Sequence, residues 1–416
     1  MSKEKSYDIS KRNVWEAWKQ VRANKGAGGV DEQSIEDFER NLKDNLYKLW
    51  NRMSSGSYMP QPVRKVLIPK SDGGKRELGI PTVEDRIAQT VVKMYLEPKL
   101  EPHFHEDSYG YRPKKSAKDA LTVTRERCWK YDWVMDIDIK AYFGSIDHEL
   151  LMRAVSKHTQ CKWVILYIER WLRAPVREED GSLRDVIRGT PQGGVISPLL
   201  ANLFLHYAFD VWMKKHFPHV PFARFADDAV LHCQTEKQAR AVKEALEQRF
   251  KVCELELHPD KTKIVYCKDG NRKEDYPNTK FDFVRFTFRP RRLKSRVGNH
   301  FIGFTPAVSN KASKELRTVM RRWSLHRRCN DSLEEIAYVV NPVVRGWLNY
   351  FGTFQKSATH PTLNHLNRIL ARWAMNRHKR LKQSRRRATY WLGRVARTEP
   401  NLFAHWKFGV RPATAQ

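Results

Sequence analysis

Long apolar runs, paired cysteines and acidic side chains are all scarce in this 416-residue sequence. No stretch of 18 apolar residues occurs, and the best candidate, residues 199–213, is interrupted by polar residues, so we expect no membrane-spanning helix. The first residues lack the apolar core of a signal peptide, which favours a cytoplasmic protein. The six cysteines form no Cys-x-x-Cys pair, which argues against a zinc knuckle and a disulfide framework.

The shortage of acidic residues leaves a large positive charge. The chain has 77 Lys and Arg against 47 Asp and Glu, a formal net charge of +30. Such a surplus indicates a polyanionic partner, and without a membrane segment nucleic acid is favoured over an anionic membrane. Residues 281–416 alone hold 28 Lys and Arg against 6 Asp and Glu. This distribution predicts a moderately charged catalytic body followed by a basic nucleic-acid-binding section.

Apolar periodicity predicts a mixed α/β body followed by a helical section. Helices are expected over 11–55, with a loop at 25–29, and over 199–212, 236–251 and 361–378. Strands are expected at 62–69, 133–138, 222–226, 229–233, 253–257, 263–266 and 281–288, with a tight turn at 71–74. From about residue 310 the chain is expected to be helical and poor in strands.

Three carboxylates stand at the ends of the predicted strands. Asp138 ends one apolar strand, and Asp227 and Asp228 lie between two others. Adjacent carboxylates repel each other unless a cation lies nearby, and Mg²⁺ prefers such oxygen ligands. Three carboxylates could hold two ions about 3.5–4 Å apart, an arrangement used in phosphoryl transfer. An Asp-Asp pair taken alone is more typical of an ordinary hairpin turn, and only the neighbouring blocks favour the metal site.

A glycine-rich segment, Gly189 to Pro198, leads into the helix predicted at 199–212. Its glycines allow a backbone to approach a base pair or sugar closely. Ser197 and Pro198 by themselves also fit a plain helix start, because serine and proline are favoured there.

Eight blocks in order resemble the group II intron-encoded reverse transcriptases, or maturases. They are residues 25–31, 68–81, 107–113, 138–143, 190–198, 225–228, 258–261 and 346–351. In its shortness, and with no cysteine after Cys329, the chain is most similar to the bacterial lineage without the endonuclease domain. The resemblance implies a bacterial protein that acts in the cytoplasm, at the nucleoid.

The resemblance implies an α+β right-hand polymerase. Its fingers and palm, with an antiparallel palm sheet, would be followed by an all-α thumb/maturase region and a basic helical tail. The implied domains are an N-terminal extension at 1–60, reverse transcriptase fingers and palm at 61–290, thumb/domain X at 291–360 and the tail at 361–416.

The resemblance also implies roles for single residues. Asp138, Asp227 and Asp228 would ligate two Mg²⁺ ions, helped by the backbone carbonyl of Ile139. Lys70 and Arg76 would grip the triphosphate of the incoming dNTP, and Phe143 would act as a steric gate against a 2′-OH. Gln192 would contact the nucleotide or template base, and Lys261 would give a proton to pyrophosphate. Each role has a plainer alternative. Lys70 and Arg76 could belong to a solvated hairpin, Phe143 could be a core aromatic, and Lys261 could be a surface lysine.

Three positions depart from the family pattern. Phe225 stands where the family usually has Tyr, and Gly144 where an Asp is common. Arg285 stands where the primer grip usually offers a glycine. An arginine there keeps the backbone farther from the primer, which bears on processivity more than on the chemistry.

The C-terminal section interleaves basic and aromatic residues. Arginine forks suit phosphates and aromatic rings stack on bases, although a solvated charged face would have the same composition. The candidate nucleic-acid-binding residues are Arg368, Arg372, Arg377, Lys379, Arg380, Lys382, Arg385, Arg386 and Arg387.

The predicted function is RNA-directed DNA synthesis by a mobile element. The chain would copy group II intron RNA by target-primed synthesis, with target DNA, primer and dNTPs as partners, and would bind the intron RNA to assist splicing. Two alternatives stay open: a domesticated reverse transcriptase used in host repair or phage defence, and a splicing maturase whose polymerase has decayed. The sequence indicates no particular oligomeric state.

Overall fold

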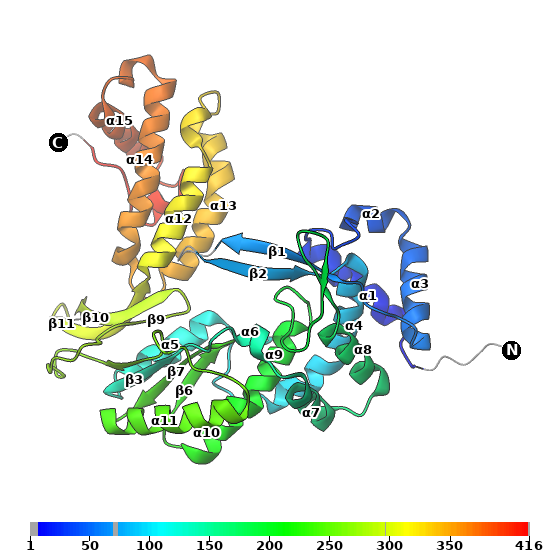
Figure 1. The fold of residues 1–416 in the computed structure, drawn as a ribbon. Coiled ribbons are helices and arrows are strands. Elements are labelled where there is room, and N and C mark those ends of the chain that lie inside the picture. Colours follow the sequence, from blue (N-terminus) through cyan, green and yellow to red (C-terminus); the bar gives the residue numbers. More distant parts are fainter. Residues whose placement is uncertain (1–6, 70–73, 296, 415–416) are drawn as a thin grey trace. The chain divides into compact units, whose positions relative to one another are not determined.

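The computed structural model describes residues 7–69, 74–295 and 297–414, and it divides the chain into two compact units. The first unit comprises residues 1–124 and 133–264, and the second comprises residues 125–132 and 265–416. The first is mixed α/β and the second is mainly helical (Figure 1). The predicted fold class, a palm sheet followed by a helical region, is confirmed.

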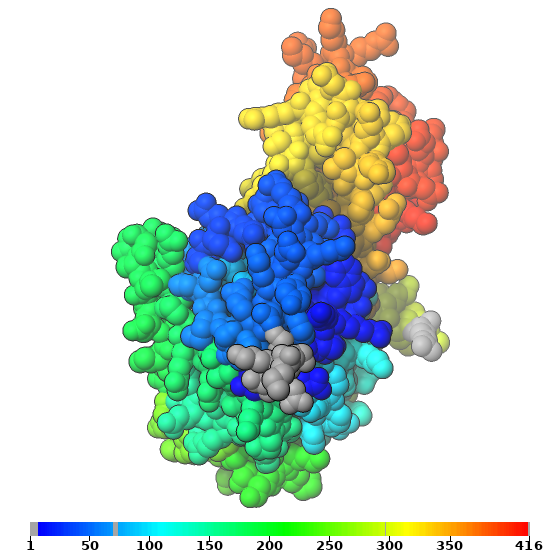
Figure 2. Space-filling model, turned by 90° about the vertical axis from the view of Figure 1, so that its right-hand side faces the viewer, coloured from blue at the N-terminus to red at the C-terminus, as the bar shows by residue number. Residues whose placement is uncertain are grey.

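Three helices open the first unit: α1 (Lys11–Asn24), α2 (Ile35–Arg40) and α3 (Leu42–Ser55). Ser10 caps α1, and Ser34 forms a capping box with Asp37 at the start of α2, which satisfies backbone N–H groups that have no helical partner. The helical prediction for 11–55, with its break, is confirmed. These helices form one surface of the first unit (Figure 2).

A small sheet follows, in the order β2-β1-β4-β5. Its strands are β1 (Val63–Pro69), β2 (Lys75–Ile80), β4 (Val176–Arg177) and β5 (Leu183–Arg184). β1 and β2 are antiparallel, with Ile68 opposite Arg76, as the predicted hairpin requires. The tip at residues 70–73, and with it Lys70, lies outside the described residues.

The second sheet of the first unit has the order β6-β7-β3-β8 and corresponds to the expected palm. Its strands are β3 (Trp133–Ile137), β6 (Phe222–Phe225), β7 (Asp228–Cys233) and β8 (Lys263–Tyr266). β7 pairs antiparallel with both β6 and β3. Helix α11 (Glu236–Val252) packs against β3 and β7 through an apolar face of Ala239, Val242, Leu246 and Phe250.

The first unit contains further helices. They are α4 (Val83–Leu100), η1 (Glu101–His103), α6 (Tyr142–Ser145), α7 (His148–His158), α8 (Lys162–Leu172), α9 (Ser197–Leu205) and α10 (Val211–His216), and α5 (Ala117–Cys128) runs across the unit boundary. Between α9 and α10 the expected helix continues as a π-helix over His206–Asp210.

Two strand predictions are wrong. Residues 253–257 form no strand, because Glu254 adopts φ +55° and the chain turns back so that the Leu255 N–H donates to the carbonyl of Phe250 (2.8 Å). Residues 281–288 are two strands rather than one, β9 (Phe281–Phe283) and β10 (Phe286–Lys294), which pair with each other. The positive φ of Val284 (45°) and Arg285 (69°) reverses the chain between them.

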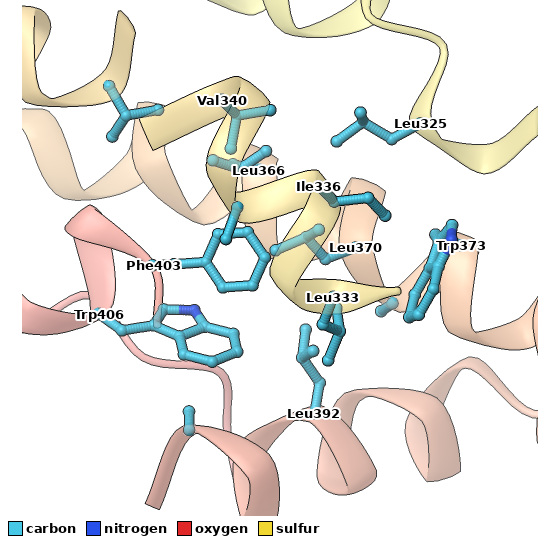
Figure 3. Packing of buried hydrophobic residues seen from close by; sticks show 14 of the residues in the cluster. Leu325, Leu333, Ile336, Val340, Leu366, Leu370, Trp373, Leu392, Phe403 and Trp406 are labelled. Atoms are coloured by element: carbon cyan, nitrogen blue, oxygen red, sulfur yellow. The ribbon is translucent and has the colours of Figure 1, made fainter. Parts of the chain in front are cut away.

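The second unit continues with β11 (His300–Val308), which pairs with β10, and then with helices. They are α12 (Asn310–Arg322), η3 (Leu325–Arg327), α13 (Leu333–Phe351), η4 (Lys356–Thr359), α14 (His360–Arg377), η5 (Lys379–Leu381), α15 (Arg385–Thr398) and α16 (Ala404–Lys407). One hydrophobic core joins them, with Ile336, Leu370, Trp373, Leu392 and Trp406 among its members (Figure 3).

This core runs from Met320 to Val410 and therefore crosses the boundary predicted at residue 360. The division between the two units follows Ile264. The functional limits of the four predicted domains stay predictions. Within the described residues, no helix is long and apolar enough to span a bilayer.

Candidate active site

The Asp227–Asp228 pair lies at a tight hairpin. Phe225 pairs with Asp228 across β6 and β7, so Ala226 and Asp227 form the two-residue turn. Ala226 adopts φ +58°, a left-handed conformation that costs an L-residue about 1–2 kcal/mol. On the other side of β7, Ile137 pairs with Ala229, so Asp138 follows at the same end of the sheet. The sheet register thus brings the three predicted carboxylates to one edge.

The pKa of Asp227 is shifted by burial and by its charged neighbours. Burial raises the pKa of Asp227, and the charge of Asp138 raises it further, while Arg76 and Arg224 act in the opposite direction. The two carboxylates therefore repel each other across the sheet, and the Arg76 guanidinium on β2 is near enough to act on the same group. A cation at this edge would relieve the repulsion.

Lys261 already places a cation beside Asp138. Its Nζ lies 2.9 Å from Asp138 Oδ2, and both side chains are partly exposed. The backbone here is fixed from the same segment, because the His258 N–H donates to the Asp138 carbonyl (2.8 Å). Ile139 is buried and forms a β-bridge with Leu257.

The residues fit a divalent ion in kind, although the site is not assembled as a closed cage. Within the described ranges, no group of three or more His, Cys, Asp or Glu side chains converges to ligand distance. Two mutually repelling carboxylates and an adjacent third are nonetheless a donor set that suits Mg²⁺.

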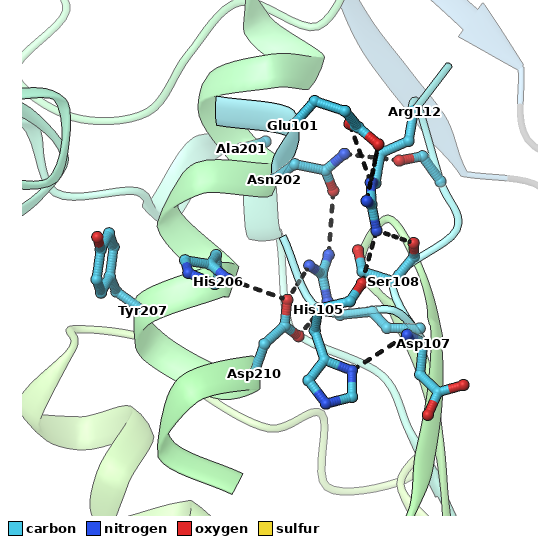
Figure 4. Close-up of polar contacts among 12 residues, drawn as sticks. Glu101, His105, Asp107, Ser108, Arg112, Ala201, Asn202, His206, Tyr207 and Asp210 are labelled. Carbon is cyan, nitrogen blue, oxygen red and sulfur yellow. Dashed lines mark hydrogen bonds and ion pairs between the residues drawn. The ribbon is translucent and has the colours of Figure 1, made fainter. Parts of the chain in front are cut away.

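A buried arginine supports the Asp227 turn. Arg224 is 1% exposed and donates from Nε and Nη2 to the two carboxylate oxygens of Asp210, at 2.8 and 2.6 Å. Its Nη1 donates to Asn202 Oδ1 (3.0 Å) and to the carbonyl of Ala226 (2.9 Å), the residue before Asp227. Figure 4 shows Asn202, His206 and Asp210 on one helical segment facing this network.

Asp210 is ionised in this network. Burial acts to raise its pKa, but Arg224 and His206 outweigh burial, so the pKa of Asp210 lies below its ordinary value. The π-helical turn at His206–Asp210 sets the register that places Asp210 opposite Arg224. Removing one member of a buried ion pair costs about 3–5 kcal/mol.

The block at 107–113 packs against the same turn. The Tyr109 N–H donates to the carbonyl of Arg224 (2.8 Å), and Asn202 Nδ2 donates to the carbonyl of Gly110 (2.6 Å). A Cβ on Gly110 would meet the backbone of Ala226 far inside van der Waals contact, so only glycine fits there. Tyr111 comes next in the chain, and burial together with the charge of Asp227 raises its pKa.

The glycine-rich segment is held between α6 and β2. The Thr190 N–H donates to the carbonyl of Phe143 (2.7 Å), and the Gly79 N–H donates to the carbonyl of Gln192 (2.8 Å). Gly189, at φ +86°, would place a Cβ 2.8 Å from the Cα of Gly144. Close backbone contacts within the protein thus account for some of these glycines, and Phe143 and Gln192 are both half-buried.

A groove of about 510 Å³ lies beside Phe225. Tyr109, Tyr111 and Phe225 line it with aromatic rings. Lys115 adds positive charge, whereas Lys93 pairs with Glu97 (3.5 Å) in the same lining. The block at 107–113 contains Tyr111, but the sequence predicted no role for that residue. Its proximity to Asp227 follows from the packing of Gly110, which no local pattern reveals.

The surroundings of Arg285 show how an arginine is accommodated where the family usually has a glycine. Val284 and Arg285 form the β9–β10 turn in left-handed conformations, which favour glycine. Tyr350 donates to the carbonyl of Val284 (3.0 Å) and the Ser309 N–H to that of Arg285 (3.0 Å). The Arg285 side chain pairs with Glu315 and lies over the ring of Phe351.

The structure does not require a glycine at position 144, where an Asp is common in the family. A Cβ on Gly144 would meet no atom within 4 Å, so an Asp would fit there.

The nine predicted nucleic-acid-binding residues, Arg368 to Arg387, are all exposed in the second unit. α14 carries the first three, and η5, α15 and the segment between them carry the others.

Comparison with known proteins settles the family. Residues 68–305 match the reverse transcriptase (RNA-dependent DNA polymerase) model, and residues 313–391 match the group II intron maturase-specific domain. The chain is a reverse transcriptase of the group II intron type. This confirms the resemblance and the expected enzyme class, RNA-directed DNA polymerase.

Two curated relatives are similar to this reverse transcriptase over different shares of their length. Protein YkfC of Escherichia coli K12 is 33% identical over 298 residues, which are 61% of this chain and 77% of YkfC. The group II intron-encoded protein LtrA of Lactococcus lactis is 34% identical over 193 residues, 46% of this chain and 32% of LtrA. The match therefore spans about a third of LtrA. A telomerase structure from Candida albicans aligns with a TM-score of 0.46 at 12% identity, covering 91% of this chain and 68% of that one.

Proposed function

We propose that this reverse transcriptase copies group II intron RNA into DNA by extending a primer on target DNA. The observation that supports the proposal is the register of β3, β6 and β7, which brings Asp138, Asp227 and Asp228 to one edge of the palm sheet. The primer 3′-OH would attack the α-phosphate of a dNTP, forming one P–O bond while the bond to the leaving pyrophosphate breaks.

Asp138, Asp227 and Asp228, with the carbonyl of Ile139, would hold two Mg²⁺ ions. Bound there, the ions would supply the positive charge that phosphoryl transfer requires. The chain's own part is to keep the Asp227 turn in place through Arg224, which binds the carbonyl of Ala226.

The other predicted residues would position the nucleotide. Arg76, close to Asp227, would bind the triphosphate together with Lys70. Phe143 would exclude a 2′-OH, and Gln192 would contact the nucleotide or the template base. Lys261, whose ammonium lies at Asp138, would deliver a proton to pyrophosphate.

The second unit would bind the intron RNA and assist its splicing. The support is the maturase-specific match over residues 313–391 and the exposed basic residues of α14 and α15. The proposal includes action on chromosomal DNA in the bacterial cytoplasm.

The decisive test is primer extension on an RNA template with dNTPs and Mg²⁺. We compare the wild type with Asp227→Ala and with Asp44→Ala, an exposed aspartate of α3. Synthesis that Asp227→Ala abolishes and Asp44→Ala preserves supports the proposal. A wild type that binds RNA tightly but makes no DNA contradicts it and favours the maturase whose polymerase has decayed.

A further inference from the structure

A concave site lies in the second unit. The end of α14, η5 and one face of α15 enclose a hollow of about 710 Å³. That volume is within the range of about 300–1,000 Å³ typical of ligand pockets. The residues that matter are Arg377, Arg380, Arg387, Tyr390, Trp391 and Arg394.

The positive charge of this hollow is not neutralised by the protein. Among the described residues, none of Arg380, Arg387 and Arg394 forms an ion pair, and all three are exposed. The sequence has no Asp or Glu between Glu335 and Glu399, so no acid from this stretch could pair with them. Uncompensated arginines around a concavity favour a phosphate-bearing ligand, because guanidinium groups bind phosphate through two parallel hydrogen bonds.

Aromatic side chains, Tyr390 and Trp391, are part of the lining of the hollow. Arg387, Trp391 and Arg394 follow each other at helical spacing on one face of α15, while Ala388, Leu392 and Ala396 of the opposite face are buried in the core. The Trp391 ring is half-buried and lies 4.8 Å from the ring of His378. Aromatic rings beside arginines suit an unstacked base and its phosphate together, whereas the bases of a paired helix are stacked on one another and cannot stack on a protein ring.

We propose that this hollow binds one unpaired nucleotide of RNA, with its base on Trp391 and its phosphate at Arg387 and Arg394. The inference deepens the proposed function and rests on RNA as the partner, since residues 313–391 belong to the maturase-specific match. It assigns Trp391 to base stacking and so distinguishes this site from a surface that only follows phosphates.

The test is equilibrium binding of the full chain to two RNA hairpins, without metal or dNTPs. The hairpins are identical except that one carries a single-nucleotide bulge. Stacking of one base contributes about 1–3 kcal/mol, so we expect the wild type to bind the bulged hairpin about tenfold more tightly. Trp391→Leu keeps an apolar side chain against the core and should remove this preference.

A second variant avoids the core altogether. Arg387→Gln/Arg394→Gln should weaken binding of both hairpins and make it less dependent on salt, because fewer phosphate contacts remain. Arg397→Gln, one turn farther along α15 and exposed, is the matched control and should keep the preference for the bulge.

Equal binding of both hairpins by the wild type, or a preference that survives in Trp391→Leu, would overturn the inference. Primer extension by the wild type judges the polymerase separately, so failure of either claim is recognised without the other.

Discussion

At the scale of single residues, Lys261 occupies the most informative position. Its ammonium contacts a carboxylate oxygen of Asp138, one of the groups proposed to hold Mg²⁺. A lysine at this place neutralises charge when no ion is present, and it must give way when an ion binds. Lys261, the proposed proton donor, and a metal ion would therefore compete for the same carboxylate of Asp138.

Lys261→Ala should lower the Mg²⁺ concentration needed for half-maximal synthesis. The competing ion pair is partly exposed and contributes at most about 1 kcal/mol, so the change should not exceed about fivefold. Titration of nucleotide incorporation with Mg²⁺ measures it, and Lys263→Ala, exposed at the start of β8, is the control. An increased Mg²⁺ requirement would show that Lys261 does not compete with the ion.

Arg285→Gly should lengthen the DNA products and change folding stability by no more than about 1 kcal/mol. Relief of the left-handed conformation contributes about 1–2 kcal/mol, and the loss of the exposed Glu315 pair and a more flexible unfolded chain offset it. Product length on a long template and thermal unfolding measure the two effects. Glu315→Gln removes the same ion pair without changing the backbone, so longer products from that variant would contradict the explanation.

At the scale of elements, the palm hairpin depends on contacts from three other segments. The π-helical turn supplies Asp210, α9 supplies Asn202, and the loop at Gly110 packs on Ala226. The Asp227 turn is therefore placed by packing as much as by its own sequence.

Gly110→Ala should reduce DNA synthesis by about a hundredfold or more while RNA binding persists. The added Cβ meets backbone atoms of Phe225 and Ala226, which cannot rotate away, and a displacement of about 1 Å at reacting groups can cost that factor. Single-turnover incorporation and RNA affinity are the measurements. Gly346→Ala on α13 meets no atom within 4 Å and should keep synthesis; equal activity of both variants would refute the argument.

The helices and strands show how much of the fold could be predicted from the sequence. Strands with clear alternation and turn residues, such as β1, β3, β6 and β7, were predicted close to their observed limits. The strand expected at 281–288 was wrong because its apolar residues continue through a reversal at Val284 and Arg285. The sequence of the expected helix at 199–212 does not indicate its π-turn, and Asp210 of that turn pairs with Arg224, a residue outside the helix.

The candidate site likewise has a part that the sequence predicts and a part that it does not. The motif that carries the three aspartates is readable in the sequence, but the buried pair of Arg224 and Asp210 is not. Both residues look like surface charges until the fold buries them. Tyr111 was overlooked because its proximity to Asp227 depends on the packing of Gly110 against Ala226, which the local sequence does not show.

At the scale of the whole molecule, the core of the second unit carries a buried histidine. His405 is fully buried, and its Nε2 lies 2.7 Å from Asn367 Oδ1. Burial lowers the pKa of His405 to about 3, against an ordinary value of 6.5. The unfolded chain therefore takes up a proton in a range of pH where the folded core does not.

Acid should destabilise the second unit between pH 6.5 and pH 3. Because the unfolded state binds the extra proton, stability falls as the pH falls, by about 2 kcal/mol between pH 7 and pH 5 from this residue. Denaturant unfolding at both pH values, compared between the wild type and His405→Gln, isolates the contribution. An identical pH dependence in the two proteins would exclude His405 as the cause.

Residues 125–132 belong to the second unit although the rest of that unit begins only at residue 265. Arg272 donates to the carbonyls of Cys128 and Tyr131, and Trp129 donates to the carbonyl of Phe304. On the ribosome this short segment is made more than a hundred residues before its partners in the second unit, so it cannot form these contacts until residues 265–304 have been synthesised. Vectorial synthesis therefore imposes an order on folding: the helical C-terminal unit closes last, on a segment translated early.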